Sequence, residues 1–152
     1  MLASLFQNTS SIDPSTKASH ILVILPKLEK LPKKHDIPGE ESLNKLLLRR
    51  EIKLTDLIAT PVSANLPDGE LCAWAMVDTN QTVFEQQTTV RKAVKLLLGE
   101  NPVELHITVH GTTQQRKIFS ELAVFTSWVN GAVLPVRKNK PVRKPLEKIF
   151  LY

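Results

Sequence analysis

Short apolar runs alternate along this chain with longer segments of helical periodicity, and this alternation constrains the fold more than any other feature. The run 20–25 is apolar and rich in β-branched residues, and it ends at Pro26, which cannot continue a central ladder. It therefore predicts a buried strand. Segments 83–98 and 112–129 carry apolar residues three or four positions apart, as amphipathic helices do. Strands that alternate with helices predict an α/β domain built in layers around a mixed sheet.

The remaining segments complete a predicted order of strand, helix, hairpin, helix, strand, helix and strand. Acidic residues begin segment 40–50 and arginines end it, a distribution that suits the dipole of a helix. The turn signal Pro67-Asp68-Gly69 joins two extended pieces into a hairpin, and Pro61 makes the first of them an edge strand or a bulged one. The predicted extended pieces are 57–63, 70–77, 103–109 and 147–152. Residues 27–39, after Pro26, are predicted to form a loop.

Each long helix has a stripe of large apolar residues, and we expect these stripes to face the core. In strand 103–109 apolar and polar residues alternate strictly, which predicts one buried face and one wet face. The wet face would carry Glu104, His106, Thr108 and His110. The predicted stripes are Phe84, Val90, Val94 and Leu97 in the first helix, and Ile118, Leu122, Phe125 and Val129 in the second.

The boundaries of the two long helices follow from their flanking residues. Residues 78–80 and 112–113 supply capping groups for the two amino-terminal ends. Gly99 is expected to end the first helix in the left-handed conformation, and Asn130-Gly131 to end the second.

Length and composition fit one domain. Of the 152 residues, 42% are hydrophobic and 23% are charged, which is typical of a globular protein and not of a disordered one. Residues 1–18 are rich in Ser, Thr and Asn and have no sustained periodicity, so we expect a flexible or loosely docked lead-in. Residues 19–152 form the predicted α/β domain, which includes a basic, proline-containing segment at 135–146.

The single cysteine, Cys72, excludes an internal disulfide and fits a reducing compartment. It lies in the apolar run 71–77, so we expect a buried, inert thiol. No stretch approaches the roughly 18 apolar residues of a membrane span, and residues 1–16 lack the cations and the apolar core of a signal peptide. These features predict a cytoplasmic protein without a membrane partner.

The net charge of +5 is concentrated in residues 134–152, which contain six Lys or Arg residues and one Glu. The rest of the chain is formally neutral. Such a segment is either a solvated linker, which Pro and self-repulsion keep extended, or a contact for an anionic partner such as nucleic acid. The candidate contact residues are Arg137, Lys138, Lys140, Arg143 and Lys144.

The sequence predicts no catalytic, metal-binding or cofactor-binding residue. It has no G-x-S-x-G nucleophile elbow, and its five glycines are isolated, unlike those of a phosphate-binding loop. On one strand His106 and His110 would stand about 13 Å apart, too far to share a zinc ion. His20 and His35 have no ligand-like neighbours in sequence, and the pair Glu40/Glu41 is explained by the helix dipole.

The carboxy-terminal residues nevertheless resemble a known family. The helical run from Glu121 to Pro135, the basic segment, and the strand from Leu146 to Leu151 are similar to the end of the amino-terminal domain of leucine (cytosol) aminopeptidases. The helix around 90–94 and the strand 105–109 lie where that domain has a helix and a strand. The resemblance covers residues 20–152.

This resemblance implies a macrodomain-like α/β sandwich. It also implies a complete enzyme that is a hexamer and hydrolyses amino-terminal residues with two divalent metal ions. Those ions and the catalytic residues would belong to a carboxy-terminal catalytic domain, in motifs of the NTDAEGR type that this sequence lacks. The expected role of the chain is assembly with its own catalytic domain and with further copies, and control of access to the active site.

Two other functions stay open from the sequence. A macrodomain-like fold could bind ADP-ribose, although the glycine-rich loops of such a site are missing. Alternatively, the basic segment could bind nucleic acid or another acidic partner.

Overall fold

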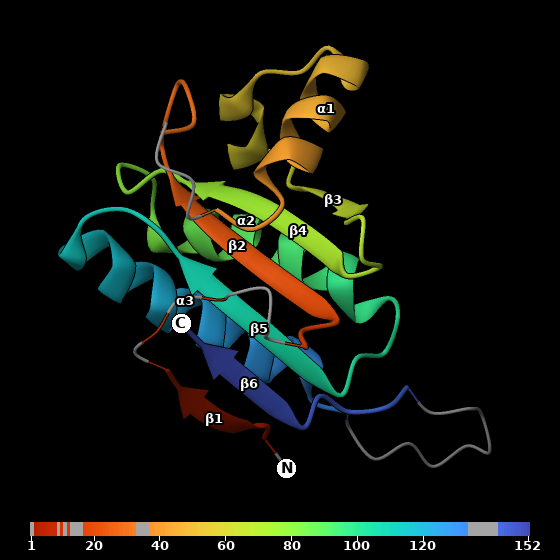
Figure 1. Ribbon diagram of the computed structural model, residues 1–152. Coiled ribbons are helices and arrows are strands. Elements are labelled where there is room, and N and C mark those ends of the chain that lie inside the picture. Colours follow the sequence, from red (N-terminus) through yellow and green to blue (C-terminus); the bar gives the residue numbers. More distant parts are fainter. Residues whose placement is uncertain (1, 9, 11, 13–16, 33–36, 134–142) are drawn as a thin grey trace.

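The computed structural model describes residues 2–8, 10, 12, 17–32, 37–133 and 143–152, and these residues form one mixed sheet with helices on both faces (Figure 1). The strand order is β1-β6-β5-β2-β4-β3. All neighbours pair in parallel except β3 and β4, which are antiparallel. The strands are β1 (Ser4–Gln7), β2 (His20–Pro26), β3 (Val62–Asn65), β4 (Leu71–Val77), β5 (Glu104–Val109) and β6 (Lys148–Leu151); the helices are α1 (Glu40–Arg50), the 3-10 helix η1 (Leu54–Ile58), α2 (Val83–Leu98) and α3 (Thr113–Gly131).

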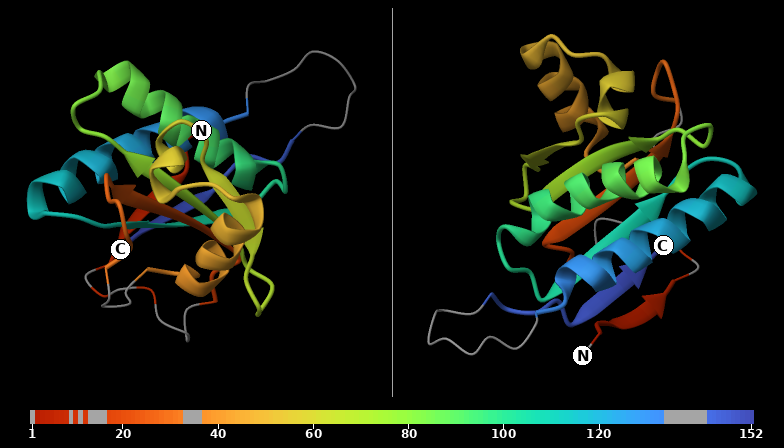
Figure 2. Two further views of the ribbon diagram at one scale, coloured as in Figure 1. Left: turned by 90° about the horizontal axis from the view of Figure 1, so that it is seen from above. Right: turned by 180° about the vertical axis from the view of Figure 1, so that it is seen from behind.

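The sheet separates two apolar cores. Helices α2 and α3 lie side by side on one face, as the view from behind shows (Figure 2), and α1 lies on the other. Alternate residues of β2 supply the two cores: Leu22 and Ile24 pack toward α2 and α3, whereas Ile21 and Val23 pack toward α1 and η1. This arrangement confirms the predicted α/β layered sandwich with a mixed sheet.

Local signals place the helices where they were predicted. Thr82 and Glu85 form a capping box at the start of α2, and Thr112 and Gln115 form one at the start of α3. The residues predicted to cap α2 make a turn instead, in which the Asp78 carboxylate accepts a hydrogen bond from the Asn80 amide at 3.0 Å.

Three local predictions were wrong. The segment predicted as strand 57–63 begins with Leu57 and Ile58, the last two residues of η1, continues as a turn, and enters β3 only at Val62. Gly99 has right-handed backbone (φ −57°), and the left-handed residue is Asn101 (φ 52°), because the chain takes two further residues to leave α2. Finally, Pro26 does pair with Val77 at the end of β2 instead of lying beyond the strand.

The middle of the β5 face that was predicted to be wet is buried, whereas Glu104 and His110 at its two ends are partly exposed. His106 and Thr108 are only 5% and 6% exposed. The His106 ring stacks on Phe150 of β6 with centroids 4.7 Å apart, and its Nδ1 lies 2.8 Å from the hydroxyl of Tyr152. Aromatic residues contributed by β6 and its end therefore cover a surface that alternation alone predicted to be solvated.

The predicted lead-in contains a strand. Residues Ser4–Gln7 form β1, which pairs in parallel with β6 at the edge of the sheet. The Trp128 indole of α3 donates a hydrogen bond to the Ala3 carbonyl at 2.9 Å and ties this strand to the domain. The other lead-in residues 1, 9, 11 and 13–16 lie outside the described residues, as do 33–36 and 134–142. Within the described part of the chain, no helix combines the length and apolarity of a bilayer crossing.

Candidate functional site

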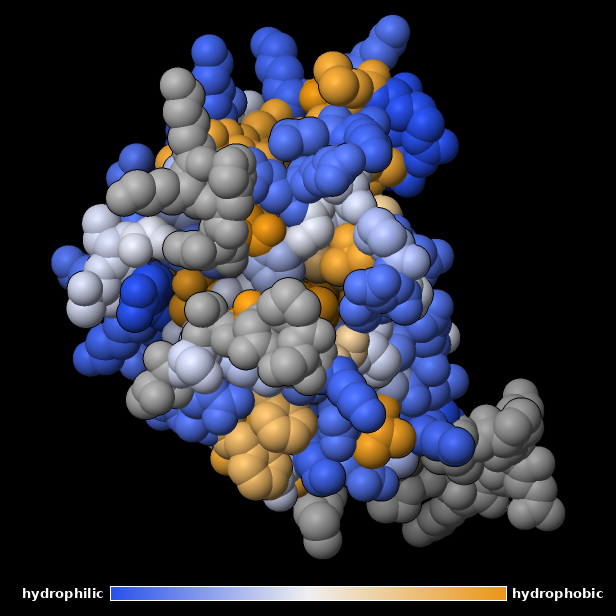
Figure 3. All heavy atoms as spheres, in the orientation of Figure 1, coloured by the Kyte–Doolittle hydropathy of each residue, from blue (hydrophilic) through white to orange (hydrophobic). Residues whose placement is uncertain are grey.

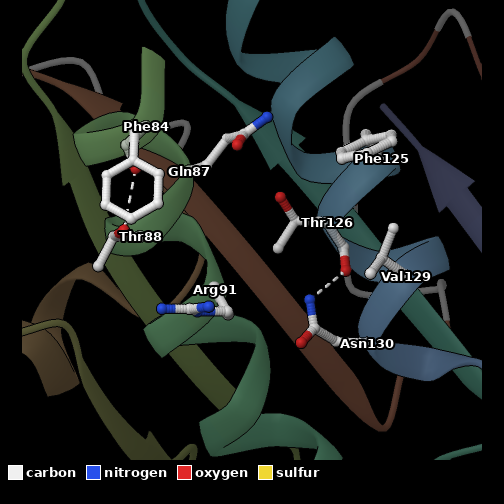
Figure 4. Close-up of a pocket in the computed structure, with 8 residues that line it drawn as sticks. All are labelled: Phe84, Gln87, Thr88, Arg91, Phe125, Thr126, Val129 and Asn130. Atoms are coloured by element: carbon white, nitrogen blue, oxygen red, sulfur yellow. Dashed lines mark hydrogen bonds between the residues drawn. The ribbon is translucent and has the colours of Figure 1, made fainter. Parts of the chain in front are cut away.

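A shallow apolar groove of about 140 Å³ runs between α2 and α3 on their solvent side (Figure 4). It forms because both helices turn other residues toward the sheet: Val90 and Val94 of α2, and Phe119 and Ala123 of α3, are fully buried. The two helices contact each other, and the space between them on the solvent side is left open. The groove is lined by Phe84, Gln87, Thr88 and Arg91 of α2 and by Phe125, Thr126, Val129 and Asn130 of α3.

Three groove residues were wrongly predicted to belong to the core. Phe84, Phe125 and Val129 are 74%, 53% and 57% exposed. In α3 the fully buried residues include Ala123 and Ser127, one turn apart. Leu122 of the predicted stripe is buried in the core and Ile118 packs against it, but because the buried residues further along are small, the stripe was wrongly extended to Phe125 and Val129.

The polar side chains of the groove bond mainly within their own helices. The Thr88 hydroxyl donates to the Phe84 carbonyl at 2.9 Å, and the Asn130 amide donates to the Thr126 carbonyl at 2.8 Å (Figure 4). Arg91 is exposed and forms no ion pair with any described residue. The groove can therefore hold an apolar side chain of a partner and offer a cation to a nearby carboxylate, but its residues include no nucleophile with an adjacent base.

Of the five predicted contact residues in the basic segment, Arg143 and Lys144 are described. The Arg143 guanidinium donates to the Asn130 carbonyl at 2.6 Å, at the end of α3 and beside the groove, where a cation suits the helix dipole. Lys144 is exposed. Arg137, Lys138 and Lys140 lie outside the described residues, so their proposed contact with an anionic partner remains a prediction.

A polar cluster that the sequence did not indicate lies at the start of β2. His20 Nε2 is 2.8 Å from the Glu100 carboxylate, and His20 Nδ1 is 2.9 Å from the Ser19 hydroxyl. Glu100 is eighty residues away in sequence, so no local spacing could have revealed this pair. In a serine hydrolase the two ring nitrogens are used the other way round: Nε2 faces the serine and Nδ1 faces the acid. The cluster therefore links the ends of β2 and α2 and has no catalytic geometry.

The described residues do not fit a metal centre. They contain no group of three or more His, Cys, Asp or Glu side chains that could hold an ion. His106 is oriented by Tyr152, whereas His110 lies 3.1 Å from the Thr108 hydroxyl. His35 lies outside the described residues.

A second depression, open and about 630 Å³ in volume, lies at the carboxyl ends of β1, β5 and β6. It is bordered by Thr113, Arg116 and Lys117 from the start of α3, and by Gln7 and Tyr152. Ligands of α/β proteins commonly bind at such strand ends. The depression therefore marks the place where an ADP-ribose site would be sought.

Cys72 is expected to resist thiol reagents in the folded protein. It is fully buried in β4, and burial, assisted by the charge of Glu70, raises the pKa of its thiol well above the ordinary range. Titration with a colorimetric disulfide reagent should give almost no reaction under native conditions and one thiol per chain in denaturant. Rapid native labelling would contradict the burial of this side chain.

His106 is expected to make the protein less stable in mild acid. Burial lowers the pKa of its imidazole below the ordinary 6.5, and the charge of Glu104 opposes this shift only in part. As the pH falls below about 6.5, His106 takes up a proton in the unfolded chain but not yet in the folded chain. The free energy of unfolding is therefore highest above this pH and declines below it. Urea unfolding of wild type and His106→Gln between pH 7.5 and 5 should show the smaller decline in the variant. An NMR titration of the His106 ring with a midpoint above 6.5 would contradict the expected direction.

Comparison with known proteins supplies a fold relative. No protein-family profile matches the chain. No curated protein matches it either. Among solved structures it is similar to the K354E mutant of tomato leucine aminopeptidase, with a TM-score of 0.53 and 9% sequence identity. The similarity covers 99% of this chain and 32% of that enzyme chain, so the protein spans about a third of its relative. At this identity the likeness shows a shared fold and transfers no residue role.

Proposed function

We propose that this chain is a non-catalytic domain of a leucine-aminopeptidase-type peptide hydrolase. One observation carries the proposal: almost the whole chain matches a third of the tomato enzyme. The order of its carboxy-terminal helix, basic segment and strand, which resembles the amino-terminal domain of that family, supports the same conclusion.

In this proposal the chain contributes contacts and not chemistry. The divalent ions of the enzyme would be held by the catalytic domain, since the described residues of this chain offer no metal-binding group. The groove between α2 and α3 is our candidate for the contact with the catalytic domain or another subunit. Its exposed Phe84, Phe125 and Val129 present an apolar surface, and Arg91 beside them, which forms no ion pair with any described residue, suits an acidic residue of the partner.

Capture of the protein from its own cells tests this function. A tag placed at the chain's own gene should recover an assembly that hydrolyses leucyl-p-nitroanilide and loses this activity with a divalent-metal chelator. The chain expressed alone as 152 residues should show no hydrolysis. Capture without peptidase activity, or peptidase activity of the isolated chain, would contradict the proposal.

Groove variants distinguish a contact surface from an incidental hollow. The double variant Phe84→Asp/Phe125→Asp should recover at least tenfold less peptidase, because two desolvated aromatic contacts are replaced by buried charges. Its midpoint of unfolding in urea should stay close to that of wild type, since both side chains are exposed. The control Leu48→Asp changes an 80% exposed residue of α1 and should recover peptidase normally.

No structural observation favours the two other functions. Calorimetric titration with ADP-ribose addresses the depression at the strand ends, and binding to duplex DNA at several salt concentrations addresses the basic segment. Micromolar ADP-ribose binding, or DNA affinity that falls steeply with salt and depends on Arg143 and Lys144, would replace the proposed function.

A further inference from the structure

The outer edge of β1 is open to pairing. Strand β1 is the terminal strand of the sheet, and all four of its residues, Ser4–Gln7, are exposed (Figure 1). The amides of Ser4 and Asn8 donate to the carbonyls of Glu147 and Leu151 at 2.8 and 2.7 Å. Since backbone groups alternate sides along a strand, the N–H and C=O of Leu5 and Gln7 point away from the sheet.

As far as the structure describes the chain, this edge lacks the features that usually prevent pairing between sheets. Proteins protect such edges with charges, proline or covering elements. The opposite edge strand, β3, follows Pro61 and contacts α1. By contrast, Ser4-Leu5-Phe6-Gln7 contains no charge and no proline, and Leu5 and Phe6 are 42% and 44% exposed.

A row of stacked rings ends at this open edge. His106, Phe150 and Phe6 are register partners across β5, β6 and β1. Their ring centroids are 4.7 Å apart between His106 and Phe150 and 5.1 Å apart between Phe150 and Phe6, with interplanar angles of 9° and 19°. Figure 3 shows an apolar area at the lower end of the molecule, where Figure 1, in the same orientation, places β1. Among the described residues no further ring stacks on Phe6, so a ring on an added strand would continue the row.

We propose that β1 pairs antiparallel with β1 of a second copy of this chain, with Phe6 opposite Phe6 across a two-fold axis. In this register Leu5 lies opposite Gln7 of the second copy, so the outward backbone groups of both residues find partners. Phe6 then occupies a non-hydrogen-bonded position, where opposite Cα atoms are about 4.5 Å apart and the side chains are close enough to stack. The result is a closed dimer with one continuous sheet.

The choice of a second copy follows from self-complementarity. Because β1 carries no charge, two copies of it do not repel each other. In such a pair the Phe6 ring of each copy is the next ring in the row of the other. This inference does not depend on the proposed function, because it concerns the isolated chain.

A charge-register experiment tests the pairing. In Leu5→Lys/Gln7→Lys each lysine would oppose a lysine of the second copy, whereas in Leu5→Lys/Gln7→Glu each lysine would oppose a glutamate. Sedimentation equilibrium of the 152-residue chain should show a dimer for wild type. The dissociation constant of the Lys/Glu variant should be roughly ten- to hundredfold lower than that of the Lys/Lys variant. A wild-type monomer at every concentration up to saturation, or equal constants for the two variants, would overturn the proposal.

Cysteine cross-linking gives an independent readout of register. Oxidation should join two chains of Phe6→Cys, because the residue sits on the two-fold axis, but not two chains of Gln7→Cys, whose partner is Leu5. The buried Cys72 should not compete. Cross-linking of Gln7→Cys in place of Phe6→Cys would exclude this register.

Discussion

Replacing Trp74 with alanine is expected to lower the free energy of unfolding by about 3–5 kcal/mol, the range for large aromatic residues in a core. Trp74 lies in β4 with no exposed surface, within the core between the sheet and α1. Its indole N–H donates to the Pro38 carbonyl at 2.9 Å, which ties the chain segment before α1 to the sheet. The substitution would leave a cavity and remove the stronger of the two donors to the Pro38 carbonyl, which would keep only the weak contact of the Cys72 thiol at 3.9 Å. Urea unfolding followed by circular dichroism measures the loss.

Two further variants separate these causes. Trp74→Phe keeps most of the volume but loses the hydrogen bond, so we expect a loss of about 1–3 kcal/mol. Phe84→Ala removes an aromatic residue of which 74% is exposed and should change stability by about 0.5 kcal/mol or less. A loss below about 1 kcal/mol for Trp74→Ala would show that this corner of the core is not formed as described.

The parts of the fold that local chemistry determines were predictable from the sequence. The order of helices and strands from β2 onward, apart from η1, the hairpin around Gly69 and the start of α3 after Thr112 depend on residues close together in the chain. A capping side chain needs only the next turn of helix, and a turn needs only four residues. These elements can therefore be predicted from the sequence without knowledge of the tertiary structure.

Predictions that required knowledge of distant partners failed. His106 is buried because Phe150 and Tyr152 reach it from β6, more than forty residues away. β1 is a strand because β6 offers it an edge, and four residues of mixed character carry no periodicity that would reveal it. In both cases the decisive contact joins segments more than forty residues apart in the chain.

The groove was missed for a related reason. Phe125 and Val129 were assigned to the core by size, but α3 turns Ala123 and Ser127 inward. The spacing of these two small residues, one helical turn apart, was the available signal for a closely packed helix face. The contact of Arg143 with the Asn130 carbonyl could not be predicted, because it depends on the path by which the chain returns to β6.

Gly39→Ala is expected to cost about 2–5 kcal/mol, for two reasons that can be separated. Gly39 precedes α1 with φ +68°, a left-handed conformation that costs other residues about 1–2 kcal/mol. An added Cβ would also lie 2.6 Å from Cδ2 of Leu66 and 2.7 Å from Cζ2 of Trp74, so overpacking adds about 1–3 kcal/mol. Urea unfolding again provides the measurement.

Gly69→Ala is the matched control, because Gly69 also has positive φ (+98°) but no heavy atom within 4 Å of the added Cβ. It should show the conformational cost alone, and the difference between the two variants measures the overpacking. In a Trp74→Phe background the atom Cζ2 of the indole is absent, so Gly39→Ala should become less costly there than in wild type. Equal costs at Gly39 and Gly69, or no coupling between Gly39 and Trp74, would mean that the segment before α1 does not rest on the indole ring. In that case the core on this side of the sheet would have to be closed by other contacts.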